Sequence, residues 1–177
     1  MNNKQEIKSS LRQCYGDVIY TLSDLDDTTF FAPRPGEKWS PAEILGHLIL
    51  SSKAINKAMS APKMFLRASF GISKEESSRF DEKIAKYHSA LSSGLKAPKG
   101  FVYKDVEVKG RDNLMSSWSS ELSKLLVSIE KWSEKDLDKY QLPHPAFGKL
   151  SVRDMLKFTD FHTQHHHEQI KEVLVTT

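Results

Sequence analysis

The segment from Ser151 to the C-terminal end constrains the fold of this 177-residue chain more than any other stretch. Its apolar residues recur at the spacing of an amphipathic helix, and four of the seven histidines lie within six consecutive positions. One stripe of this helix contains eight residues: Met155, Phe158, Thr159, His162, His166, Gln169, Ile170 and Val173. Such a stripe normally faces a core, so we expect His162 and His166 to point inward.

His162 and His166 are four residues apart, which places their Cβ atoms about 6 Å apart on one helix face. Two imidazoles at this separation can share one divalent ion. An affinity-tag remnant is excluded as an explanation, because the histidines lie within a periodic helix that continues to Leu174. The sequence therefore predicts that this helix supplies two ligands to a metal site.

Three further segments show helical periodicity: residues 4–26, a segment that begins at Ser40 and ends before Pro62, and a segment that runs from Asp112 to Trp132. Ser40-Pro41-Ala42-Glu43 is typical of a helix start, with a capping hydroxyl, a proline at the first position and a glutamate at the third. Four long amphipathic helices predict an all-α four-helix bundle. No linker interrupts residues 1–177, so we expect a single domain.

The connections between these helices have mixed lengths. Between the second and third bundle helices we expect a polar helix from Ser73 to about Leu91, followed by a weakly alternating, extended segment over residues 101–108. Residues 133–149 contain prolines and polar residues before the last helix, which predicts a loop there.

The composition restricts the classes of function. No apolar run approaches the ~20 residues that span a bilayer, and the N-terminal residues lack the pattern of a signal peptide. The only cysteine, Cys14, cannot form an internal disulfide, which favours a cytoplasmic location. The net charge is +3 and the lysines are scattered among acidic residues, so we expect neither a membrane nor a nucleic acid as partner.

His47 lies one turn after Glu43, on the same helix face as Ile44 and Leu48. A single histidine on an apolar stripe is more often a core residue whose hydrogen bonds are satisfied than a metal ligand. The spacing alone leaves both roles open.

Several motifs resemble those of a known family. The pattern around the second helix is Pro33-x-Pro35-x-x-x-Trp39-Ser40-x-x-Glu43-x-x-x-His47-Leu48. It resembles the second-helix signature of the DinB-like superfamily. Near the C-terminus, His144-Pro145-x-Phe147-Gly148-x-Leu150-Ser151 is followed by Phe158-x-x-x-His162-x-x-x-His166-x-x-Gln169-Ile170. This stretch is similar to the one that closes the bundle in that family.

The resemblance implies an up-down-down-up four-helix bundle in which His47, His162 and His166 hold a divalent metal. Characterised relatives include thiol S-transferases that use bacillithiol and isomerases that use mycothiol or glutathione, and many others are described as metal-dependent hydrolases. The resemblance implies a small-molecule substrate and, since relatives are commonly dimeric, a homodimer. Imidazole ligands admit several ions, of which we expect zinc first and nickel next.

Three neutral imidazoles leave the full 2+ charge on the ion, which favours hydroxide or thiolate as a fourth ligand. This donor set suits hydrolysis or transfer of a low-molecular-weight thiol, and the sequence does not separate the two. A non-catalytic, metal-stabilised dimeric stress or binding protein is the alternative. An open coordination position distinguishes an enzyme from a structural site, and the absence of an obvious fourth ligand in the sequence favours the enzyme.

The other histidines have simpler expectations. His144 precedes a proline, so we expect a turn residue, and its alternative role is a general acid or substrate contact at the rim of the site. We expect His165 and His167 to be solvated residues beside the ligand face, and His88 to be exposed. Gln169 and Glu43 are the candidate acceptors for the second ring nitrogens of the ligands, although Glu43 is already expected to cap its helix.

Three other residues could suggest chemistry but fit the core better. Cys14 lies on an apolar helix face, where an inert buried thiol is more usual than a nucleophile. Trp118 and Trp132 continue the apolar stripe of the third bundle helix, so we expect both in the core rather than in a ligand site.

Overall fold

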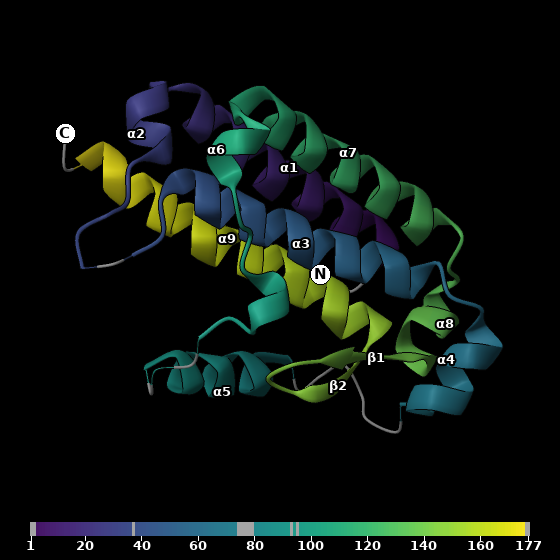
Figure 1. Cartoon of the computed structure of the whole chain (residues 1–177). Helices are drawn as coiled ribbons and strands as arrows, with labels where there is room; N and C mark the ends of the chain where they lie inside the picture. Colours follow the sequence, from purple (N-terminus) through teal and green to yellow (C-terminus); the bar gives the residue numbers. More distant parts are fainter. Residues whose placement is uncertain (1–2, 37, 74–79, 93, 95, 176–177) are drawn as a thin grey trace.

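The structure is a computed structural model that describes residues 3–36, 38–73, 80–92, 94 and 96–175. Four long helices form the bundle, α1 (Lys4–Ser23), α3 (Pro41–Met59), α7 (Arg111–Glu130) and α9 (Val152–Val175). Helices α3 and α7 run in one direction, whereas α1 and α9 run in the other (Figure 1). The most extensive helix contacts join α3 to α7 and α1 to α9. The all-α bundle with up-down-down-up order is therefore confirmed.

Shorter elements connect the bundle helices. They are α2 (Asp27–Phe31), α4 (Lys63–Phe70), α5 (Phe80–Ser92), a 3₁₀ turn (Lys99–Phe101), α6 (Val106–Lys109), α8 (Glu134–Lys139) and strands β1 (Gln141–His144) and β2 (Gly148–Ser151). The two strands form an antiparallel hairpin in which Gln141 pairs with Ser151 and His144 with Gly148. Helix α5 lies beside the hairpin, below α9 in the view of Figure 1.

The starts of two bundle helices match the capping signals of the sequence. The Ser40 hydroxyl accepts a hydrogen bond from the Glu43 amide at 3.1 Å, and the Glu43 carboxylate accepts one from the Ser40 amide at 2.8 Å. At the start of α9, the Ser151 hydroxyl accepts a hydrogen bond from the Asp154 amide at 3.0 Å. These bonds satisfy amide groups that would otherwise lack partners in the first turn.

The segments that connect the bundle helices differ most from the structure expected from the sequence. Residues 133–149 were predicted as a loop but contain α8 and the hairpin, which bury Leu137 and Leu142 completely. Elements of four to six residues are too short to produce a readable periodicity. In the region predicted to be extended, residues 106–109 form helix α6. The predicted polar helix appears as α5 from Phe80, and most of its expected cap, residues 73–76, lies outside the described residues.

An aromatic pair lies at the centre of the core between α1 and α7. The rings of Tyr15 and Trp118 stack with centroids 3.7 Å apart, and the Trp118 indole N–H donates to the Tyr15 carbonyl at 3.2 Å. Trp132 is also buried, so the core roles of both tryptophans are confirmed. The thiol of Cys14, the residue before Tyr15 on α1, is also buried, and burial raises its pKa, which agrees with an inert thiol.

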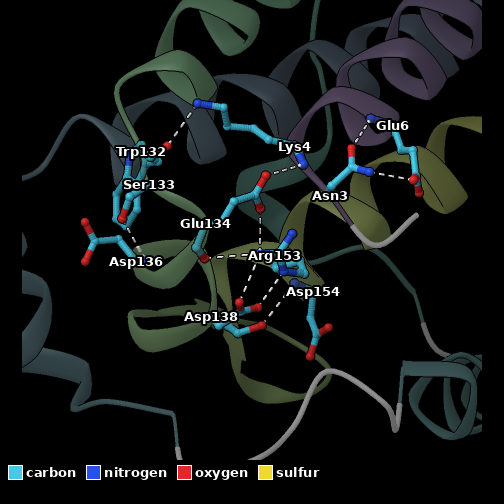
Figure 2. Close-up of polar contacts among 11 residues, drawn as sticks. Asn3, Lys4, Glu6, Trp132, Ser133, Glu134, Asp136, Asp138, Arg153 and Asp154 are labelled. Carbon is cyan, nitrogen blue, oxygen red and sulfur yellow. Dashed lines mark hydrogen bonds and ion pairs between the residues drawn. The ribbon is translucent and has the colours of Figure 1, made fainter.

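The first turns of α9 are buried on every side, including their charged residues. The Arg153 guanidinium contacts the carboxylates of Glu134 at 2.8 Å and Asp138 at 3.0 Å (Figure 2). The other carboxylate oxygen of Glu134 accepts a hydrogen bond from the Lys4 amide at 2.9 Å. This network joins the starts of α1 and α9 to α8, and it fixes the helix that carries the histidine cluster.

Across the described ranges, no helix has both the length and the apolar character that crossing a membrane requires. The cytoplasmic location stays a prediction.

Candidate metal centre

Three buried histidines from two helices meet inside the bundle. The Nε2 atom of His162 on α9 lies 3.1 Å from Nε2 of His47 on α3 and 3.2 Å from Nε2 of His166. Each of these residues is at most 8% exposed. The structure therefore brings together the three histidines that the family resemblance implied as ligands, although His47 is 115 residues away from His162 in sequence.

The spacing of these nitrogens suits a single small cation. Zinc binds imidazole nitrogen at 2.0–2.1 Å with tetrahedral angles, so two ligand nitrogens of one ion lie about 3.3 Å apart. The observed 3.1 and 3.2 Å are close to this value. One ligand atom from each histidine can be chosen so that all three lie within 4.8 Å of one another. The three residues could thus hold a metal ion.

The orientation of His47 is fixed by a residue that the sequence did not suggest. Its Nδ1–H donates to the carbonyl oxygen of Phe101 at 2.8 Å, so its Nε2 lone pair points into the cluster. Glu43, one of the two predicted acceptors, is instead used by the helix cap. A backbone carbonyl carries no sequence signal, because every residue has one.

Gly46 explains how Phe101 reaches His47. The chain between the 3₁₀ turn and α6 crosses α3 so closely that a Cβ atom on Gly46 would lie 2.5 Å from the Cβ of Tyr103. No other residue type fits at this position without displacing the crossing segment. The glycine therefore allows the Phe101 carbonyl to reach the His47 ring.

His166 is oriented by Gln169, the other predicted acceptor. Its Nδ1 lies 2.9 Å from the Gln169 side-chain oxygen. The Gln169 side-chain nitrogen lies 3.1 Å from Nε2 of His165. His165 is half-buried, so its predicted role as a solvated residue is wrong. It faces the amide that orients a candidate ligand.

All three clustered imidazoles favour the neutral form. Burial lowers the pKa of His47, lowers that of His166 to about 3, and lowers that of His162 well below its usual range, where repulsion from His166 and His47 adds to the effect. Neutral imidazole is the form that binds metal. Since Nδ1 of His47 and of His166 each donates to an oxygen, their two lone pairs converge on His162. Three unprotonated ring nitrogens are a donor set that fits a divalent cation.

Aromatic rings surround the cluster. Trp39 lies 5.0 Å from the ring of His47 and is nearly parallel to His166 at 6.4 Å. Phe158 stacks on His162 at 5.4 Å. Arg34 joins the segment before α3 to α9, because its Nε donates to the Trp39 carbonyl and its Nη1 to the Gln169 carbonyl, both at 2.7 Å.

The ring of Phe158 lies between His144 and His162 of the cluster. The His144 imidazole contacts Phe147 at 4.7 Å and the edge of Phe158 at 4.4 Å. The Ala146 amide donates to its Nδ1 at 3.1 Å, which is the expected turn contact and leaves the ring proton on Nε2. Burial lowers the pKa of His144 to about 4, so the ring is neutral at pH 7.

The remaining histidines lie outside the cluster. His167 is half-buried rather than solvated, because its Nε2 bonds to the Thr21 hydroxyl of α1 at 2.7 Å. His88 is exposed as expected, with its ring 5.2 Å from that of Phe161.

Two solved structures have a similar fold. One is TT2238, described as a four-helix bundle protein, with a TM-score of 0.62 and 17% identity over 96% of this chain and 99% of that one. The other is the colibactin self-resistance protein ClbS in complex with double-stranded DNA, with a TM-score of 0.59 and 13% identity over 98% of this chain and 96% of that one. At these identities the likeness shows the fold alone.

The ClbS complex corrects one expectation from the sequence. We expected no nucleic acid partner because the net charge is small and the lysines are scattered. A protein of this fold has been solved with double-stranded DNA. That exclusion is wrong, because charge balance and fold class together do not rule out a nucleic acid.

Comparisons at the level of sequence give the family. The chain is 28% identical to the uncharacterized protein YuaE of Bacillus subtilis (strain 168) over 156 residues, which cover 86% of this chain and 87% of that protein. The family model of the DinB superfamily matches residues 10–170. This match includes all three clustered histidines and every bundle helix at least in large part, and the chain is therefore a member of the DinB superfamily.

Proposed function

We propose that this protein is a metal-dependent enzyme in which His47, His162 and His166 bind one divalent ion, with zinc the first expectation and nickel the next. The observation that supports the proposal is the convergence of three buried, neutral Nε2 atoms from α3 and α9. Burial disfavours protonation of all three imidazoles, so their ring nitrogens stay available as metal ligands.

The number of ligands favours catalysis over a structural role. In the part of the chain that the structure describes, the group of side chains able to hold an ion contains these three histidines and no fourth member. Structural zinc sites usually have four protein ligands, whereas catalytic sites leave one position for water or substrate. When bound, such an ion supplies Lewis acidity that lowers the pKa of a water or thiol reaching it.

The surrounding residues have separate roles in this proposal. The Phe101 carbonyl and the Gln169 side chain hold the Nδ1 protons of His47 and His166, so both Nε2 lone pairs face the ion. The rings of Trp39 and Phe158 pack against the imidazoles of His47 and His162 and help to bury them. The neutral His144 ring has its proton on Nε2, which makes it a hydrogen-bond donor for a substrate at the rim of the site.

The reaction that fits this donor set is attack by a nucleophile with a lowered pKa on a small molecule. Transfer of a low-molecular-weight thiol, as in the bacillithiol S-transferases among the characterised members of the family, and hydrolysis both belong to this class. Three neutral ligands leave the charge of the ion undiminished, which stabilises either a thiolate or a hydroxide. We also propose that residues 1–177 are one domain, which the family match over residues 10–170 supports.

The second candidate is a non-catalytic, metal-stabilised dimeric stress or binding protein. It requires the ion to hold the fold together, so a chelator would unfold the protein cooperatively. In an enzyme with an open site, the chelator would abolish activity and leave most of the helices folded. The homodimer stays a prediction that light scattering tests, and the likeness to ClbS makes double-stranded DNA a partner to test by fluorescence anisotropy.

The decisive experiment is elemental analysis of the purified protein and of four alanine variants. We expect about one equivalent of metal in the wild type, and a small fraction of it in His47→Ala, His162→Ala and His166→Ala. His167→Ala is the matched control, because it removes a half-buried histidine of the same helix outside the cluster. A full equivalent of metal in any of the three ligand variants would contradict the assignment. Thiol-transfer and hydrolysis assays with and without the metal then identify the reaction class.

A further inference from the structure

The side chain of Gln169 joins a candidate metal ligand to a histidine that is not in the cluster. Its oxygen faces Nδ1 of His166 at 2.9 Å, and its nitrogen faces Nε2 of His165 at 3.1 Å. The His165 ring is itself held in place, because it is nearly parallel to the ring of Phe161 at 6.4 Å. The Gln169 carbonyl also accepts a hydrogen bond from Arg34, which fixes this turn of α9.

The two ends of an amide are chemically different, so its orientation determines where the imidazole protons lie. The Gln169 oxygen can only accept, which requires the His166 proton on Nδ1 and leaves the Nε2 lone pair free for a metal. The Gln169 nitrogen can only donate, which requires a lone pair on Nε2 of His165. With its proton on Nδ1, His165 therefore stabilises the one orientation of the amide that makes His166 a ligand.

The opposite orientation of the amide would disable the site. Rotation by half a turn would place the NH₂ group against Nδ1 of His166, and the His166 proton would move to Nε2. That proton would then lie between His166 and His162, whose Nε2 atoms are 3.2 Å apart. It would occupy the space where the ion is expected. An acceptor at position 165 opposes this rotation, because the rotated amide would direct its oxygen at the His165 lone pair.

We propose that His165 is a positioning residue of the metal centre, which acts through the Gln169 amide to hold His166 in its metal-binding tautomer. This inference depends on the proposed metal site and adds to it a residue outside the coordination sphere. Each of the three consecutive histidines then has a different partner. His165 orients Gln169, His166 faces the cluster, and His167 bonds to Thr21 on α1.

Three variants separate the hydrogen bond from the packing of His165. His165→Phe keeps a ring to stack on Phe161 but removes the acceptor. His165→Gln removes the ring but places an amide oxygen near the former Nε2 position, so it restores an acceptor. His167→Phe is the matched control, since it makes the same change two residues further along α9, where the lost partner is Thr21.

The readout is the Zn²⁺ dissociation constant, measured by competition with a chromophoric chelator. Loss of a partner behind a ligand histidine typically weakens metal binding about 10–100-fold, so we expect Gln169→Leu within this range and His165→Phe near its lower end. His165→Gln should recover most of the affinity, and His167→Phe should bind as the wild type does. The visible absorption of the Co²⁺ form should change in His165→Phe and Gln169→Leu only.

These measurements distinguish failure of the role proposed for His165 from failure of the proposed metal site. A wild-type protein that binds neither Zn²⁺ nor Ni²⁺ overturns both proposals. A wild type that binds tightly, with unchanged affinity and Co²⁺ spectrum in His165→Phe, overturns the role of His165 alone. Should His165→Phe fail to fold, ¹⁵N NMR of the wild-type imidazoles decides the matter. We expect the proton of both His165 and His166 on Nδ1, and a proton on Nε2 of His165 would contradict the inference.

Discussion

The metal-free protein should lose stability steeply as the pH falls from 7 to 5, and His166 allows the size of the loss to be worked out. Burial lowers the pKa of this residue to about 3 in the folded protein, against about 6.5 in an unfolded chain. Between these values the unfolded chain binds a proton that the folded protein does not, so unfolding is favoured as the pH falls. The contribution is complete above pH 6.5 and is lost on the way down to pH 3.

The magnitude follows from the same two values. Each pH unit below 6.5 costs about 1.4 kcal/mol for one such group, so His166 alone should remove about 2 kcal/mol between pH 7 and pH 5. His47 and His162 act in the same direction, because burial lowers the pKa of both. Urea unfolding at pH 7, 6 and 5, followed by tryptophan fluorescence with a chelator present, measures the total loss.

The variant His166→Gln isolates one of the three contributions. It keeps a polar side chain but cannot titrate, so its free energy of unfolding should fall by about 2 kcal/mol less than that of the wild type over the same range. Carboxylates elsewhere in the chain titrate in both proteins and cancel in the comparison. Parallel curves for wild type and variant would refute the reasoning, because they would mean that His166 takes up its proton in the folded protein as readily as in the unfolded chain.

Four further substitutions test the fold and the approach to the site. Trp118→Ala removes a fully buried ring and should destabilise the protein by about 3–5 kcal/mol, which chemical denaturation would measure. Ser40→Ala removes the cap of α3 and should cost about 1 kcal/mol by the same assay. Arg153→Met leaves Glu134 without its guanidinium partner, and since that carboxylate can hydrate, we expect about 1–3 kcal/mol. Gly46→Ala should push Tyr103 away from α3 and weaken zinc binding about 10–100-fold, seen in chelator competition, with a smaller effect on unfolding.

Local signals predicted the bundle helices well. The capping box at Ser40 and Glu43 and the cap at Ser151 are interactions within four residues, so they can be read from the sequence and are present in the structure. The apolar stripes of the long helices likewise predicted which tryptophans are buried. Helix α8 and the β1–β2 hairpin escaped prediction, because they are short and their stability comes from burial against α4 and α9 rather than from their own sequence.

In the candidate site too, spacing along one helix could be read from the sequence, whereas contacts that depend on the packing of distant segments could not. His162 and His166 share a helix face, so their proximity follows from spacing alone. The position of His47 beside them depends on how α3 packs against α9, and only the family resemblance indicated it. The partners of these ligands were harder still. Gln169 could be named because it lies on the same helix face, whereas the Phe101 carbonyl comes from a crossing segment with no periodic pattern.

The error on His165 shows why a helical wheel underestimates the role of residues beside a ligand face. The wheel places His165 off the inward stripe and so predicts a solvated residue, but it describes only the direction of Cβ. The imidazole and the Gln169 amide are long enough to meet four residues apart along the helix surface, at 3.1 Å. A polar residue next to a ligand stripe can therefore face the solvent with one edge and the ligand network with the other. In a helix with histidines at 162, 165 and 166, the sequence determines which two can share an ion, and only the hydrogen-bond directions of Gln169 reveal what the third one does.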